Sequence, residues 1–74
     1  MEKAYKYNPT DYEEILSSNM LAFYKAYEDR NFPAMISEMN HLFSETKYAM
    51  KEGYISASTR EEILEYFGGL MYDD

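Results

Sequence analysis

Two interruptions in the hydrophobic pattern constrain the fold of this chain more than any other feature of its sequence. The first is Asn31-Phe32-Pro33 and the second is Gly53. Proline disfavours the α-conformation at the residue before it, and glycine readily adopts the left-handed conformation that ends helices. Between these breaks, apolar residues recur at the three- and four-residue spacing of amphipathic helices. The 74-residue sequence therefore predicts three helices, over approximately 9–30, 33–52 and 57–68.

The first predicted helix has a clear start signal. Asn8 is suited to cap it, Pro9 suits the first helical position, and Asp11 can complete a capping box. Thr10 and Glu13 offer the same box two residues later, so a helix start two residues further along is the alternative. We expect this helix to end just before the proline-containing interruption. Its predicted core face consists of Tyr12, Ile15, Leu16, Asn19, Phe23, Ala26 and Tyr27.

The second and third helices are delimited by Gly53 and by a serine cap at Ser56 or Ser58. The double glycine at 68–69 is expected to weaken or end the third helix. The predicted core face of the second helix is Met35, Ile36, Met39, Leu42, Phe43, Thr46, Ala49 and Met50. That of the third helix is Thr59, Ile63, Tyr66, Phe67 and Leu70.

Short connections between these helices favour antiparallel packing of sequential neighbours. Only residues 3–7 alternate in polarity, and that segment is too short to build a sheet. A chain of this length supports one modest core. We therefore predict an all-α protein, a small antiparallel three-helix bundle with a short N-terminal arm, as one domain over 1–74.

The junction between the second and third helices reads Gly53-Tyr54-Ile55-Ser56. It resembles the junctions of bacterial SHOCT-like helical hairpins, in which glycine, an apolar pair and serine or threonine join two helices. The resemblance covers a short part of the chain and implies a helical hairpin there. It implies no activity.

The charge of the chain excludes several classes of function. Fourteen acidic residues against seven basic ones give a formal net charge of −7, which argues against direct binding of nucleic acid. With no cysteine, the chain cannot form disulfides, a thiolate zinc site or a cysteine nucleophile. The longest apolar run, Met20 to Tyr24, is too short to span a membrane, and no signal peptide is recognisable. A cytoplasmic protein is expected.

The sequence also predicts no enzyme activity and no cofactor or metal. His41 is the only imidazole, and Ser37 and Glu45 lie one turn to either side of it. Such an exposed row lacks a pocket and oxyanion donors, so a solvated histidine–glutamate pair is the expected structure. The acidic cluster of the third helix also lacks the alternating spacing of a calcium loop.

The hypothesis that we favour is a non-enzymatic, acidic protein-binding module. Residues 61–74 carry five acids and no base. A more specific version is a small phage or mobile-element inhibitor of the anti-CRISPR or anti-restriction class, which mimics nucleic acid against a basic nucleic-acid-binding partner. The simpler alternative is that these carboxylates are favoured by the helix dipole or by solubility. The acidic candidates for partner binding are Glu61, Glu62, Glu65, Asp73 and Asp74, and the apolar ones are Leu21, Tyr24, Tyr48 and Tyr72.

Several tyrosines lie outside the predicted core, and two interpretations remain open. Tyr5, Tyr7 and Tyr72 can simply cover the ends of the core, or they can belong to a binding face. The alternative function is a structural or regulatory homo-oligomer, such as a homodimer. Its predicted seam consists of Met20, Leu21, Tyr24 and Tyr48.

Overall fold

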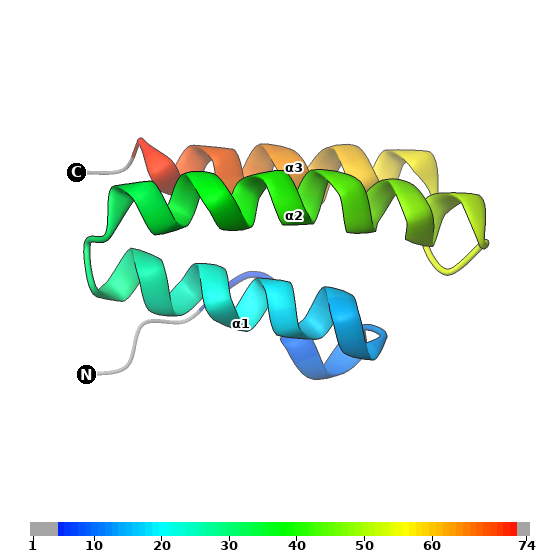
Figure 1. Ribbon diagram of the computed structural model, residues 1–74. Coiled ribbons are helices and arrows are strands. Elements are labelled where there is room, and N and C mark those ends of the chain that lie inside the picture. Colours follow the sequence, from blue (N-terminus) through cyan, green and yellow to red (C-terminus); the bar gives the residue numbers. More distant parts are fainter. Residues whose placement is uncertain (1–4, 73–74) are drawn as a thin grey trace.

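The computed structural model describes residues 5–72. A 3-10 turn, η1 (Pro9–Asp11), precedes three α-helices, α1 (Glu14–Glu28), α2 (Phe32–Lys51) and α3 (Ala57–Met71). Figure 1 shows the three helices side by side, with α2 running antiparallel to both of the others. No strand is present within the described part of the chain. The predicted antiparallel three-helix bundle is confirmed.

The first helix begins later than its capping signals predict. Asn8 does act as a cap, but its side chain accepts from the backbone N–H of Thr10 and caps only η1. The chain is then extended at Tyr12 and Glu13. The Glu13 carboxylate accepts from the backbone N–H groups of Ile15 and Leu16, at 3.0 and 2.8 Å, and so caps α1. The continuous helix predicted from Pro9 is therefore interrupted. The Glu13 carboxylate starts a new helix because it supplies acceptors for the first free N–H groups of α1.

The first two helices end in the same hydrogen-bonded turn. After α1, Arg30 adopts the left-handed conformation (φ 55°), and the N–H of Asn31 donates to the Ala26 carbonyl at 2.9 Å. After α2, Gly53 adopts φ 82°, and the next N–H donates to the Ala49 carbonyl at 2.9 Å. Both are Schellman motifs, in which a left-handed residue reverses the chain and satisfies carbonyls of the last turn. The predicted role of Gly53 is confirmed, whereas the left-handed arginine was not foreseen.

The third helix begins at its serine cap and continues beyond the predicted end. The Ser56 hydroxyl accepts from the Thr59 N–H at 3.1 Å, which decides between the two predicted serines. The helix then continues through Gly68 and Gly69 to Met71. Packing of its last turn against the core outweighs the weak helix propensity of glycine.

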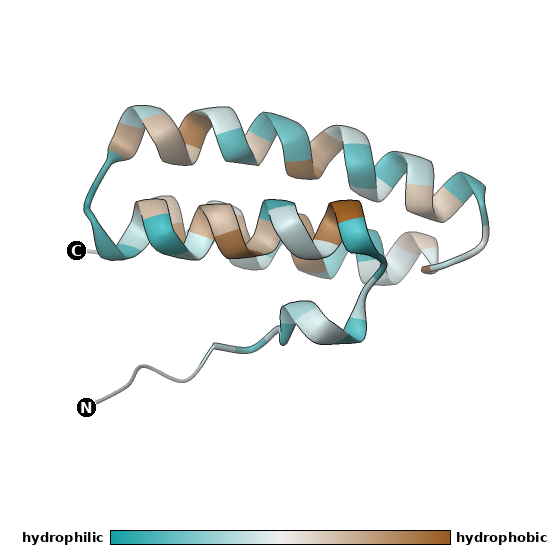
Figure 2. Ribbon diagram, turned by 60° about the horizontal axis from the view of Figure 1, so that its bottom comes forward, coloured by the Kyte–Doolittle hydropathy of each residue, from teal (hydrophilic) through white to brown (hydrophobic). Residues whose placement is uncertain are grey.

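The core lies between the three helices and is closed by the arm. The rings of Phe23 in α1 and Phe67 in α3 meet edge to face, with centroids 5.0 Å apart. In Figure 2, hydrophobic residues recur along all three helices among hydrophilic ones. The largest side chains that are completely buried are Phe23, Phe67, Leu16, Met20, Leu42, Ile63 and Thr46.

The buried arcs of α1 and α2 are rotated from their predicted positions. Met20 and Tyr24 are buried although they lie outside the predicted core face of this helix, and Ile15, which belongs to that face, is exposed. On α2, Ile36 and Phe43 were expected in the core and are exposed. On α1, the rotation arises because the arm covers one side of the helix and α2 covers another. The residues between the arm and α2 therefore become the core face of α1.

Candidate protein-binding surfaces

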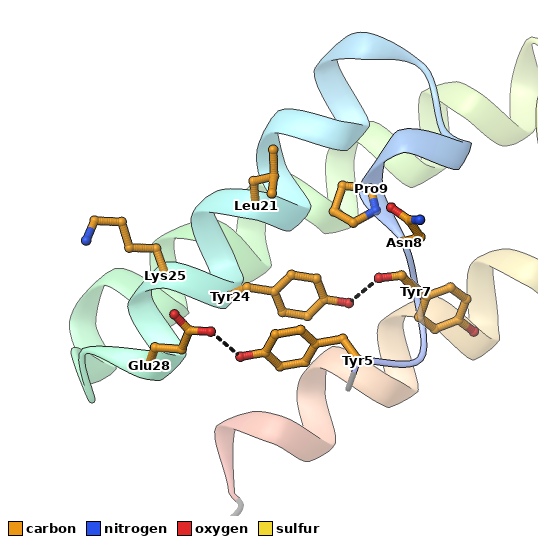
Figure 3. Close-up of a pocket in the computed structure, with 8 residues that line it drawn as sticks. All are labelled: Tyr5, Tyr7, Asn8, Pro9, Leu21, Tyr24, Lys25 and Glu28. Atoms are coloured by element: carbon orange, nitrogen blue, oxygen red, sulfur yellow. Dashed lines mark hydrogen bonds between the residues drawn. The ribbon is translucent and has the colours of Figure 1, made fainter. Parts of the chain in front are cut away.

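The N-terminal arm is held against α1 by two tyrosines. The Tyr5 ring stacks on the Tyr24 ring, with centroids 3.9 Å apart and an interplanar angle of 12°. The Tyr24 hydroxyl donates to the Tyr7 carbonyl at 2.8 Å, and the Tyr5 hydroxyl donates to Glu28 at 2.7 Å, as Figure 3 shows. Tyr24 is only 5% exposed. Its predicted role as a partner-binding residue is therefore wrong, because the arm already covers it.

The arm also reaches α3 through Tyr7. This residue is 8% exposed, and its ring centroid lies 5.3 Å from that of Tyr66 and 6.2 Å from that of Phe67. The backbone N–H of Lys6 donates to the Tyr66 hydroxyl at 3.1 Å. Tyr5 and Tyr7 thus complete the core, as the simpler of the two interpretations predicts. Tyr72 does not, since it is 79% exposed.

Burial of these phenols changes their acidity. Burial, followed by the hydrogen bond to the Glu28 carboxylate, raises the pKa of Tyr5 to about 12. Burial also raises the pKa of Tyr24 and, to a smaller extent, that of Tyr12. Tyr5, Tyr12 and Tyr24 therefore retain their protons to a higher pH than free phenols do, and at physiological pH they act through packing and hydrogen bonding.

A depression lies between the arm and α1. Figure 3 shows its aromatic floor and the side chains around it. It offers one cation, Lys25, and one carboxylate, Glu28, which is already bonded to the arm. It is lined by Tyr5, Tyr7, Asn8, Pro9, Leu21, Tyr24, Lys25 and Glu28.

Three predicted acidic residues form an exposed surface on α3. Glu61, Glu62 and Glu65 are all exposed, and none makes an ion pair with a residue in the described part of the chain. Because α3 begins at Ala57, all three lie beyond its first turn. The helix dipole acts mainly within the first turn, so it gives them little stabilisation. Asp73 and Asp74 lie outside the described residues.

The remaining predicted residues are exposed but are not brought together. Leu21 lines the depression next to the arm. Tyr72 lines a second depression, together with Lys6, Glu62 and Glu65. Tyr48, 53% exposed on α2, lines neither of these depressions. These three side chains therefore do not form one surface.

An exposed apolar surface on α2, bordered by half-buried residues of α3, was not predicted. On α2, Phe32, Ile36 and Phe43 are exposed and lie within about 40° of one another around the helix axis. We call it the α2–α3 strip, and it consists of the exposed Phe32, Ile36 and Phe43 together with the half-buried Met39, Leu64 and Met71. Ile36 and Phe43 belong to the predicted core face of α2, so the sequence pattern by itself did not indicate their exposure.

Two contacts show that the halves of this strip adjoin. A Cβ placed on Gly68 of α3 would lie 3.9 Å from the Met39 methyl carbon of α2. The Arg60 guanidinium of α3 lies over the Phe43 ring, 4.6 Å from its centroid, and donates to the Phe43 carbonyl and to the Thr46 hydroxyl. Arg60 makes no ion pair with a carboxylate among residues 5–72.

His41 lies outside both depressions. Its Nδ1 is 3.2 Å from the Glu38 carboxylate, and the histidine side chain is largely exposed. The expected solvated pair is present, with Glu38 as the partner in place of Glu45. Within residues 5–72, no three histidine, cysteine or acidic side chains are grouped so that they could hold a metal ion. No helix in this range is long and apolar enough to cross a membrane.

Comparisons with protein-family models, with curated proteins and with solved structures find no match to this chain. Its function is therefore inferred from its own surfaces.

Proposed function

We propose that this chain is a non-enzymatic protein-binding module that binds a basic protein through α3. The surface that carries the proposal consists of Glu61, Glu62 and Glu65, and we call it the acidic α3 surface. These carboxylates are exposed, unpaired within residues 5–72 and beyond the reach of the helix dipole. Neighbouring like charges destabilise a helix by about 0.2–0.5 kcal/mol per pair. Folding therefore gives no reason for this cluster of carboxylates, whereas a basic partner does.

The more specific proposal is mimicry of nucleic acid. Glu61 and Glu65 are one helical turn apart, so their carboxylates form a row of negative charges on a rigid support. A protein that binds nucleic acid presents clustered lysine and arginine to the phosphates. A small acidic bundle can occupy such a groove, which is the strategy of the anti-CRISPR and anti-restriction class of inhibitors. As part of the same proposal, we place the chain in the cytoplasm, because it has no cysteine.

The test compares two variants of equal charge. Glu61→Gln, Glu62→Gln and Glu65→Gln together neutralise the acidic α3 surface. Glu14→Gln, Glu45→Gln and Glu52→Gln remove the same charge from scattered positions on α1 and at the end of α2. The intact chain and both variants are immobilised and incubated with a native lysate, and the captured basic proteins are identified. For each captured protein, a competition experiment shows whether this chain and DNA bind to the same site.

We expect the first triple variant to lose the partner and the second to keep it. Affinity should fall by at least about tenfold between about 50 and about 200 mM salt, since the contact is between opposite charges. A partner that binds both variants equally, that ignores salt, or that holds DNA and this chain at the same time would contradict the proposal.

The homo-oligomeric alternative also remains a proposal, but its predicted seam requires correction. Met20 and Tyr24 are buried in the core and cannot contact a second copy. Leu21 and Tyr48 are exposed on α1 and α2. A contact between copies therefore needs another surface.

A further inference from the structure

We propose that the depression between the N-terminal arm and α3 takes an arginine side chain of the basic partner, whose guanidinium pairs with Glu62 and Glu65 and stacks on Tyr72. This inference rests on the proposed function and deepens it, because it names the side chain that the partner inserts next to the acidic α3 surface. It depends on three properties of the depression, which are its shape, its charge and its aromatic walls.

The depression lies over the second half of α3, where a glycine leaves a gap in the helix surface. Gly69 is exposed, and a Cβ placed on it would meet no atom of another described element within 4 Å. Glu65 lies about one turn before this gap and Tyr72 about one turn after it, and both line the depression. Helical side chains lean towards the N-terminus of their helix, so Tyr72 reaches back towards the gap. The gap therefore has room for a guest side chain between a carboxylate and a ring.

The charge of the depression is unbalanced. Glu62 and Glu65 are exposed and make no ion pair among residues 5–72. Lys6 also lines the depression, but its ammonium lies over the Tyr7 ring, 5.4 Å from the ring centroid, and pairs with neither carboxylate. Two carboxylates against one ammonium leave one negative charge in excess. A single guest cation would neutralise it.

The aromatic walls favour arginine over lysine as that cation. Tyr66 is a fixed wall, because its hydroxyl accepts from the Lys6 N–H at 3.1 Å and its ring contacts the Phe67 ring edge to face. Tyr72 is 79% exposed, so its ring is accessible to a guest. A planar guanidinium stacks on an aromatic ring and can donate to carboxylates at the same time. An ammonium is a compact point charge and does not stack in this way.

The same pair of contacts is available to an arginine on a nucleic acid. There the guanidinium donates to a phosphate and stacks on the face of an unpaired base. In this depression, a glutamate takes the place of the phosphate and a tyrosine ring that of the base. An arginine that binds nucleic acid is therefore the guest that fits the proposed mimicry.

Two peptides of equal charge test the preference for arginine. The probes are an alternating glycine–arginine decapeptide and the matching glycine–lysine decapeptide, titrated into the intact chain at low salt by calorimetry. We expect the arginine peptide to bind about two- to fivefold more tightly, which is the range of a cation–π contact at an exposed site. Equal affinities would overturn this inference and leave the proposed function standing. If neither peptide bound, the proposed function would fail as well.

Filling the gap tests whether the preference arises in this depression. Gly69→Leu occupies the gap without changing the charge, and leucine is more favourable than glycine within a helix. Gly69→Ala is the matched control, because it makes the same kind of change to the helix but adds only a Cβ. Gly69→Leu should bind both peptides equally, with an unchanged affinity for the lysine peptide, whereas Gly69→Ala should keep the preference. A preference that survives in Gly69→Leu would overturn the proposal.

Removal of the ring tests the stacking. Tyr72→Ala should lose the preference for the arginine peptide, whereas Tyr48→Ala should keep it, because Tyr48 is an exposed tyrosine of α2 outside the depression. Circular dichroism confirms that each variant is folded. Combined replacement of Glu61, Glu62 and Glu65 by glutamine should weaken both peptides, which tests the proposed function separately. If Tyr72→Ala kept the full preference, the guanidinium would not stack on this ring and the inference would be wrong.

Discussion

The Tyr24 hydroxyl donates to the Tyr7 carbonyl at 2.8 Å, and this bond joins the middle of α1 to an arm that precedes it by 17 residues. The two phenols differ in one respect. Tyr24 has its hydroxyl satisfied, whereas the Tyr7 hydroxyl is buried with no hydrogen-bond partner in the described part of the chain. This difference predicts opposite effects for the same substitution.

Tyr24→Phe should destabilise the protein. The substitution keeps the ring that stacks on Tyr5 but leaves the buried Tyr7 carbonyl without this donor. The free energy of unfolding should fall by about 1–2 kcal/mol, as measured by urea denaturation. Tyr72→Phe is the control, because its exposed hydroxyl makes no such bond, and it should change stability by less than about 0.5 kcal/mol. Equal stability of Tyr24→Phe and the intact chain would show that the arm is not held by this bond.

Tyr7→Phe should stabilise the protein. Removal of a buried hydroxyl without a partner removes a desolvation penalty, and the ring keeps its contacts with Tyr66 and Phe67. We expect the free energy of unfolding to rise by about 1 kcal/mol. The same urea titration measures it. A loss of stability would mean that the hydroxyl has a partner in solution.

Alkaline pH should unfold the protein through its buried phenols. Folding raises the pKa of Tyr5 from 10.0 to about 12, so the native state retains a proton that the unfolded state releases. This stabilisation is complete below pH 10 and is lost as the pH rises from 10 towards 12. Tyr24, whose pKa is also raised by burial, adds to the loss in the same direction.

Tyr5→Phe should reduce this alkaline loss of stability. The substitution removes the titrating group and retains the stack on Tyr24. Urea midpoints at neutral and alkaline pH give the difference, and ultraviolet absorbance follows phenol ionisation directly, because the chain contains no tryptophan. If the intact chain and Tyr5→Phe lose equal stability between neutral and alkaline pH, Tyr5 is not responsible.

The two Schellman motifs predict opposite responses to glycine and alanine. Arg30 has φ 55°, a conformation that costs a residue with a side chain about 1–2 kcal/mol. Arg30→Gly should therefore raise the free energy of unfolding by about 0.5–1 kcal/mol after the entropy of glycine is included. Gly53→Ala should lower it by about 1 kcal/mol, because no contact offsets the strain at φ 82°. Thermal unfolding measures the change in the free energy of unfolding for each variant. If both changes had the same sign, the left-handed conformation would not be the cause.

The sequence by itself determined the number, order and approximate limits of the helices. Pro33, Gly53 and the serine cap act locally, since each changes the conformational preference or hydrogen bonding of a few adjacent residues. For this reason α2 was predicted to within one residue at each end. The exposed acidic α3 surface was equally visible in the sequence.

Only the tertiary structure decided which arc of each helix is buried. Periodicity determines which residues share a face, but the neighbours of a helix determine which face is covered. The arm covers α1 at Tyr24, which removes that residue from the surface. On α2, burial is centred on Leu42 and leaves Ile36 and Phe43 exposed. The α2–α3 strip arises from these nonlocal contacts, and the sequence pattern alone did not place it on the surface.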